Sequence, residues 1–421
     1  MPKPTFPKPK IFISHSAKES EAQTVLKALI KCLKPDFEVL VDKERLKGGD
    51  DFREEILGWI NRAHGAVILF SANALTRPWI KYESGLLSSR RTLAKGKSFT
   101  LIPVLLSPVT RDDLDSADFS PMQLAALHFV RSDNLKQICK QVRAGFSGLL
   151  QPKLPPTPFE ELLIRIVPLL KTVDENVLLT AAIAMGVDVS DWTDAATYPE
   201  LLATQMLMHG LTTAGKAIRE LQDFVSPQTE ERLIELIAPT WVNLQAASAI
   251  PRIATNSNQT LRRLWLNGGD DYPDFTAGHF VRRACSRAPD SCWPVLFVPS
   301  EAAEDELGYY RLVIRESLKT RLLRKENATD AEVRLLLGER EKNLEPIFVA
   351  FYPPGPSSEA LTALRTEFPT LTFFILTGNE AANELANFPA DVEFLEPKLA
   401  AGEEAAAYAQ YITVRSYRLS T

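Results

Sequence analysis

The chain has 421 residues, of which 45% are hydrophobic and 24% are charged, as in ordinary globular proteins of two or three domains. This composition excludes a wholly disordered chain, a collagen and a small disulfide-rich scaffold. The 48 Lys and Arg residues against 53 Asp and Glu give a net charge of −5, which argues against nucleic acid as a direct partner.

The sequence predicts a soluble protein of the cytoplasm, with no membrane partner. Its proline-rich first ten residues lack the apolar core of a signal peptide, and no apolar run approaches the roughly 20 residues of a membrane span. The four cysteines, at positions 32, 139, 285 and 292, show no disulfide-framework spacing, which favours reduced thiols.

Residues 9–148 are expected to form an open α/β domain. Apolar strand-like runs lie at 11–14, 38–42, 66–71 and 100–106, and they alternate with helical patterns at 19–33, 51–63 and 79–94. Runs that are apolar on successive residues indicate strands buried on both faces. Alternation of strand and helix indicates a parallel sheet covered by helices.

Three further parts follow. Residues 151–158 contain four prolines and predict a stiff linker, and residues 159–250 show only helical periodicity, with Gly186 and Gly210 at helix-ending positions. Residues 251–421 return to an α/β pattern. Its expected strands are 293–299, 346–353, 370–378 and 392–397, and its expected helices are 306–323, 328–342 and 357–368.

Polar residues gather at the predicted carboxyl ends of the first strands, where ligands bind in open parallel sheets. These residues are Ser14, His15 and Ser16 after the first strand, Asp42 after the second and Ser71 after the third. Beyond the third strand, Trp79 and Glu83 are four residues apart, on one face of the helix that begins there. The sequence therefore predicts a polar site that contains one carboxylate.

These segments resemble the landmarks of a Toll/interleukin-1 receptor (TIR) domain. The resemblance rests on 12–16, on Asp42 with the Gly48-Gly49 loop, on 69–73 and on 79–83, in the right order on the right elements. It covers about a third of the chain and implies a flavodoxin-like parallel sheet. Glu83 followed by Ser-Gly resembles the bacterial members of the family.

The resemblance implies cleavage of the nicotinamide–ribose bond of NAD⁺, with NAD⁺ as the substrate and with no cofactor or metal. Glu83 is then the catalytic carboxylate, because oxocarbenium character develops on the ribose while the leaving group departs neutral. The implied substrate-binding residues are Phe12, Ser14, His15, Asp42, Gly48, Gly49, Ser71 and Trp79. The loop from Asp42 to Gly49 also contacts a neighbouring TIR domain in this family.

Structural alternatives stay open for each position. Glu83 fits a solvated helix residue, Trp79 fits core packing and His15 fits a capping or loop residue. Phe12 fits the core as well as a pocket wall, and Asp42 fits a cap of the loop that follows it.

Two other motifs do not support a site. Residues 210–217, GLTTAGKA, nearly match a phosphate-binding loop, but Ala217 replaces the hydroxyl residue and the preceding segment is helical in pattern. A helix-ending glycine explains this segment better. His279, Cys285 and Cys292 fit no common zinc spacing, which favours structural cysteines.

The C-terminal parts resemble modules of bacterial conflict systems. Residues 159–250 are similar in position to small adaptor domains, and residues 251–421 resemble an inactivated signal-transducing (STAND) NTPase. The predicted first strand, 293–299, leads into a stretch with four acidic residues, which would repel phosphate.

The expected function is an NAD⁺ glycohydrolase of bacterial anti-phage defence. The expectation includes self-association through TIR domains and control by C-terminal parts that sense an unknown trigger or partner. Two alternatives stay open: a non-catalytic TIR assembly protein, and a cyclase that makes a cyclic ADP-ribose messenger. Hydrolysis and cyclisation differ in how the pocket excludes water, which the sequence does not reveal.

Overall fold

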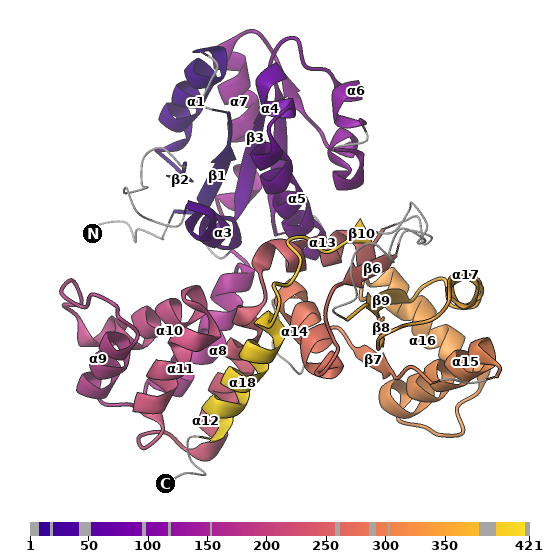
Figure 1. Cartoon of the computed structure of the whole chain (residues 1–421). Helices are drawn as coiled ribbons and strands as arrows, with labels where there is room; N and C mark the ends of the chain where they lie inside the picture. The colour runs from indigo at the N-terminus through magenta and orange to yellow at the C-terminus, as the bar shows by residue number, and fades with distance from the viewer. Residues whose placement is uncertain are drawn as a thin grey trace. The chain divides into compact units, whose positions relative to one another are not determined.

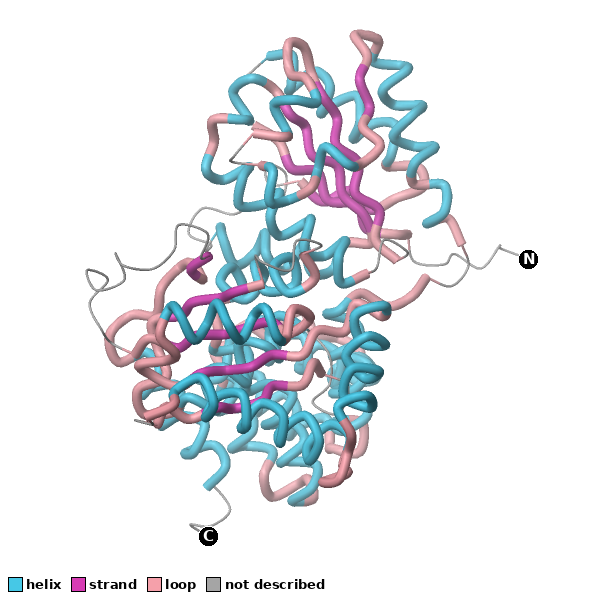
Figure 2. Tube along the Cα trace, turned by 90° about the vertical axis from the view of Figure 1, so that its right-hand side faces the viewer, coloured by secondary structure: helices cyan, strands magenta, loops and turns pink. Residues whose placement is uncertain are grey.

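The structure is a computed structural model that describes residues 8–16, 20–41, 52–94, 98–116, 119–151, 154–256, 262–285, 292–301, 304–378 and 393–416. The chain divides between Glu161 and Leu162 into two compact units. Each unit contains one five-stranded sheet whose strands are all parallel (Figures 1 and 2).

The sheet of the first unit has the strand order β2-β1-β3-β4-β5. Its strands are β1 (Lys10–Ser14), β2 (Glu38–Leu40), β3 (Gly65–Phe70), β4 (Thr100–Leu105) and β5 (Val130–Arg131). The expected open α/β fold is confirmed. The sequence did not predict β5, because two residues are too short a run to show a strand pattern.

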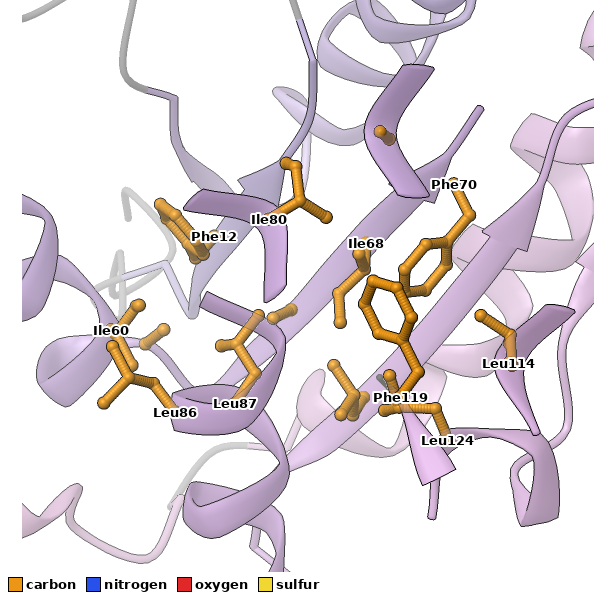
Figure 3. Packing of buried hydrophobic residues seen from close by; sticks show 14 of the residues in the cluster. Phe12, Ile60, Ile68, Phe70, Ile80, Leu86, Leu87, Leu114, Phe119 and Leu124 are labelled. Atoms are coloured by element: carbon orange, nitrogen blue, oxygen red, sulfur yellow. The ribbon is translucent and has the colours of Figure 1, made fainter. Parts of the chain in front are cut away.

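Helices cover both faces of this sheet. They are α1 (Ser20–Leu33), α3 (Phe52–Arg62), α4 (Ala72–Leu75), α5 (Pro78–Leu93), α6 (Arg111–Leu114) and α7 (Leu135–Gly145). Because side chains alternate along a strand, each face has its own apolar cluster. Phe12 and Ile68 pack beneath α3 and α5 (Figure 3), whereas Ile13 and Val67 pack beneath α1 and α7.

The second unit begins with helices, as expected. They are α8 (Pro158–Leu170), whose first turn belongs to the first unit, α9 (Glu175–Ala184), α10 (Tyr198–Met208), α11 (Gly210–Leu221), α12 (Pro227–Ile237) and α13 (Leu244–Ala254). Gly186 and Gly210 have the positive φ of helix-ending glycines, at 81° and 73°. The segment that nearly matches a phosphate loop is part of α11.

The second sheet has the order β10-β6-β9-β8-β7. Its strands are β6 (Arg263–Leu266), β7 (Val295–Val298), β8 (Phe348–Phe351), β9 (Thr372–Leu376) and β10 (Glu393–Phe394). The prediction that residues 293–299 form the first strand was wrong, because β6 precedes them. Two arginines obscured β6 in the sequence. Arg262 is only 3% exposed and binds both carboxylate oxygens of Glu341 at 2.7 Å.

The helical part and the second sheet share one compact unit. The remaining helices are α14 (Pro273–Cys285), α15 (Glu306–Ser317), which continues as a π-helical turn to Leu323, α16 (Asp330–Lys342), α17 (Ser358–Glu367) and α18 (Glu403–Ser416). Trp241, in the turn after α12, stacks on Phe275 of α14 at 5.4 Å between ring centroids. A Cβ built on Gly215 of α11 would lie 2.8 Å from Val414, so α18 packs closely against α11.

Over the described ranges no single helix is both long and apolar enough to cross a membrane, and only Pro227–Trp241 with Leu244–Ala254, bent by 90°, meet the criteria as a pair.

Candidate functional site at the carboxyl edge of the first sheet

The turn after β3 brings the start of α5 to the carboxyl edge of the sheet. Ser71 ends the strand and caps α4, since its Oγ accepts a hydrogen bond from the Ala74 N–H at 3.2 Å. Asn73 Oδ1 then accepts from Arg77 Nε at 2.7 Å, and Pro78 begins α5. Glu83 lies five residues into the helix, about 8 Å along its axis from the start.

Glu83 is a buried carboxylate, with 3% of its surface exposed. The alternative of a solvated helix residue does not fit this burial. Its neighbours along the buried side of α5 include Ile80 and Leu87, which belong to the apolar cluster beneath α3 and α5. Removing a carboxylate from water is costly, so a buried one is a candidate for chemistry.

Two buried hydroxyls accompany this carboxylate. Ser14 ends β1 and lies on the same face of the sheet as Phe12, because residues two apart in a strand share a face. Ser84 follows Glu83 on α5. Ser14 is 1% exposed and Ser84 is 0% exposed, and neither Oγ makes a hydrogen bond to another residue that the structure describes. Buried hydroxyls are usually paired, so both are available to a ligand.

Sequence reasoning named Ser14 but missed Ser84. The available signal was the place of Ser84 directly after Glu83 on α5. This helix covers the face of the sheet on which Ser14 lies. A serine inside a predicted helix indicates only a weak helix former, so the helical pattern of this segment did not identify Ser84 as a site residue.

The aromatic residues of the predicted site take part in packing. Phe12 is 1% exposed and lies in the apolar cluster beside Ile80 (Figure 3). Trp79 is half-buried against the same cluster, and its ring lies 5.0 Å from that of Tyr82. The core alternative therefore accounts for the placement of Phe12, and its role against a substrate stays a prediction.

The other predicted residues divide into two groups. His15 follows β1 and is 6% exposed, at the carboxyl edge where it was expected. Ser71 lies there too, and its side-chain oxygen caps α4. Asp42, Gly48 and Gly49 lie outside the described residues, so the loop that they form is not part of this geometry.

A separate pocket of about 280 Å³ opens at the same edge but on the other face of the sheet. Val25, Leu106 and Ile138 line it, and all three belong to the cluster beneath α1 and α7. Glu21 and Asp133 contribute carboxylates to its lining. The sheet therefore separates this pocket from Glu83 and Ser14, and the pocket is not the predicted substrate site.

The opposite, amino edge of the sheet holds a buried basic group. Arg90 donates to the Ala63 carbonyl at 2.9 Å, and burial lowers the pKa of Arg90 to about 10 although Glu160 and Glu161 oppose the change. Burial likewise lowers the pKa of His64, whose Nε2 lies 3.8 Å from Glu160 Oε2. These groups anchor the first turn of α8 and lie far along the strands from Glu83, so their role is structural.

Over the described ranges, no three His, Cys, Asp or Glu side chains are placed to hold a metal ion together. On the face beneath α3 and α5, the described residues of the candidate site offer the carboxylate of Glu83 and the hydroxyls of Ser14 and Ser84.

Comparison with known families identifies the first unit. Residues 11–139 match the family model described as TIR domain. A search of curated proteins finds no match to the chain. The five-stranded parallel sheet with helices on both faces fits the flavodoxin-like fold expected from the resemblance, so this part of the chain is a TIR domain.

Proposed function

We propose that the TIR domain cleaves the nicotinamide–ribose bond of NAD⁺ and that Glu83 is its catalytic carboxylate. The observation that carries this proposal is the burial of Glu83 at the carboxyl edge, on the same side of the sheet as the hydroxyls of Ser14 and Ser84, which have no hydrogen-bond partner among the described residues. A buried acid beside unsatisfied hydroxyls suits a ligand that presents both developing positive charge and sugar hydroxyls.

The residues suit the chemistry of this bond. Nicotinamide leaves a ribosyl pyridinium as a neutral molecule, so no side chain has to protonate it. Positive charge develops at the ribose, where a carboxylate held in a poorly solvated place stabilises it more strongly than one in water. In this proposal the hydroxyls of Ser14 and Ser84 exchange hydrogen bonds with the ribose hydroxyls.

The proposal extends to control of the activity. TIR domains commonly self-associate, and we propose that assembly completes the site while the second unit responds to a trigger or partner, in bacterial anti-phage defence by NAD⁺ depletion. Activity per protomer should therefore rise with protein concentration. A constant activity per protomer across a wide concentration range would contradict control by assembly and leave the catalytic proposal intact.

The direct test is NAD⁺ consumption by the purified full chain at high concentration, with separation of the products. Glu83→Gln keeps the shape of the side chain and removes its charge, and we expect a loss of roughly a hundredfold or more. Glu21→Gln is the matched control, because it removes a glutamate charge from α1 on the other face of the sheet. Equal loss in both variants would refute a specific role for Glu83.

The same assay separates the two alternatives. A product that retains the ADP-ribose in cyclic form indicates a cyclase, whereas free ADP-ribose indicates a hydrolase. If wild type and Glu83→Gln are equally inert while the chain still forms assemblies, the TIR domain is a non-catalytic assembly module and the enzyme proposal fails.

A further inference from the structure

The carboxyl end of β6 is the expected ligand position of the second sheet. The strand order β10-β6-β9-β8-β7 places β6 next to β9, and their following connections leave in opposite directions along the sheet. In parallel sheets, ligands bind outside the strand ends at such a switch point. The loop after β6 runs into α14, whose amino end favours an anion.

A side chain of the protein already fills this position. The Gly269 N–H lies 3.0 Å from both carboxylate oxygens of Glu404, and Thr276 Oγ1 donates a hydrogen bond to Glu404 Oε1. Gly269 has a φ of +88°, which a residue with a side chain rarely adopts, so the direction of its N–H depends on glycine. A backbone N–H and a hydroxyl thus form a cradle for one oxyanion.

Glu404 comes from the distant end of the chain. It lies in the first turn of α18, 135 residues beyond Gly269. Just before this helix, Leu399 exchanges two backbone hydrogen bonds with the Asn267 side chain, at 2.8 and 2.9 Å. The segment from Leu399 onward is therefore fastened to the loop after β6 mainly by polar contacts at its beginning.

The rest of α18 packs through half-buried side chains. Among its residues, all of which the structure describes, only Val414 is buried. Tyr408 stacks on Tyr272 at 3.7 Å between ring centroids, and Arg415 forms an exposed ion pair with Glu231 at 3.2 Å. Tyr408 and Tyr411 also contact Phe275, at 5.2 and 5.3 Å between ring centroids, so aromatic packing holds the middle of the helix while the exposed ion pair contributes little. The Glu404 anchor adds a polar contact at the amino end of α18, whose one buried side chain, Val414, lies near the other end.

We propose that the loop after β6 is an oxyanion-binding site that the chain fills with its own Glu404, and that α18 is a strap which a competing carboxylate displaces. The ligand class follows from the local charge. Asp270, Asp271 and Asp274 lie in the same loop and in the first turn of α14. Their negative charge disfavours polyphosphates and leaves a singly charged carboxylate, such as the C-terminal carboxylate of a peptide that is otherwise not acidic, as the fitting ligand.

Hydrogen exchange of the full chain tests the strap. Glu404→Gln keeps an acceptor oxygen and removes the charge, and we expect the amides of α18 to exchange roughly tenfold faster than in wild type while those of β8 do not change. Glu403→Gln is the matched control, since it removes the neighbouring charge from the same helix end but leaves the cradle occupied. Equal α18 exchange in wild type and both variants would overturn the strap.

Chemical rescue tests the oxyanion site. In Glu404→Ala the cradle is empty, and acetate should restore slow exchange of α18 and Gly269 more effectively than chloride or phosphate at equal ionic strength. Acetate with no greater effect than chloride would overturn a carboxylate site. If phosphate protects better than acetate, the assignment of ligand class is wrong. Should Glu404→Ala not fold, as judged from β8, the same anions are added to the wild-type chain, where acetate should compete with Glu404 and speed the exchange of α18 more than chloride or phosphate; equal effects would overturn the carboxylate site.

Discussion

His279 should make the second unit sensitive to acid. Its ring lies on α14 among Trp241, Phe275 and Tyr411, and it is 5% exposed. Trp241 Nε1 donates a hydrogen bond to His279 Nδ1 at 2.7 Å, so this nitrogen must carry no proton. Burial, and to a smaller extent Arg282, lowers the pKa of His279 to about 3. Protonation would both charge a buried ring and break the bond to Trp241.

The sign and size of the effect follow from this pKa. The folded state binds the proton less tightly than the unfolded state, whose histidine pKa is about 6.5. The contribution is therefore fully present above pH 6.5 and is lost as the pH falls towards 3. At about 1.4 kcal/mol per pKa unit, the loss is roughly 2 kcal/mol at pH 5 and roughly 4 kcal/mol at pH 3.

Urea unfolding of the full chain between pH 7.5 and pH 4.5 measures this loss. His279→Gln can still accept from Trp241 and cannot be protonated, so its free energy of unfolding should fall less steeply with decreasing pH than that of wild type. His209→Gln, at the exposed end of α10, serves as the control and should keep the wild-type slope. Parallel slopes for wild type and His279→Gln would refute the reasoning.

Three further predictions concern the first unit. Phe12→Ala should lower the free energy of unfolding by about 3–5 kcal/mol, measured by urea unfolding, because it empties a fully buried place; a change near zero would show that Phe12 is not core. Ser71→Ala should cost about 1 kcal/mol through the lost helix cap, and a much larger loss of NAD⁺ turnover than of stability would instead reveal a substrate contact. Burial, reinforced by Cys139, raises the pKa of Cys32 to about 12, so iodoacetamide at pH 8 should modify Cys32 far more slowly than an unfolded control, as mass spectrometry would show; equal rates would contradict this.

Much of the fold was predictable because it depends on local patterns. Strands buried on both faces are apolar on successive residues, and the segments at β1, β3 and β4 show this without interruption. β6 escaped prediction for the opposite reason. Its buried Arg263 and the preceding Arg262 look like a surface segment until the pairing of Arg262 with Glu341, 79 residues away, is known.

The site was predictable in part for the same reason. Glu83 is buried and its role stays a prediction, whereas the strand period that places Phe12 in the core also places Ser14 on the same face of the sheet. Contacts between distant segments have no local pattern. The hydrogen bonds from Trp241 to His279 and from Gly269 to Glu404 join residues that are far apart in the sequence, so they depend on the tertiary structure.

The separation of the two faces at the carboxyl edge has a consequence for inhibitor discovery. A compound that occupies the pocket lined by Val25, Leu106 and Ile138 leaves the Glu83 side of the sheet open. Screens that score binding alone will collect such compounds together with those that reach Glu83. Under the NAD⁺-cleaving activity proposed above, competition with NAD⁺ sorts them, since only compounds on the Glu83 side should lose apparent potency as the NAD⁺ concentration rises.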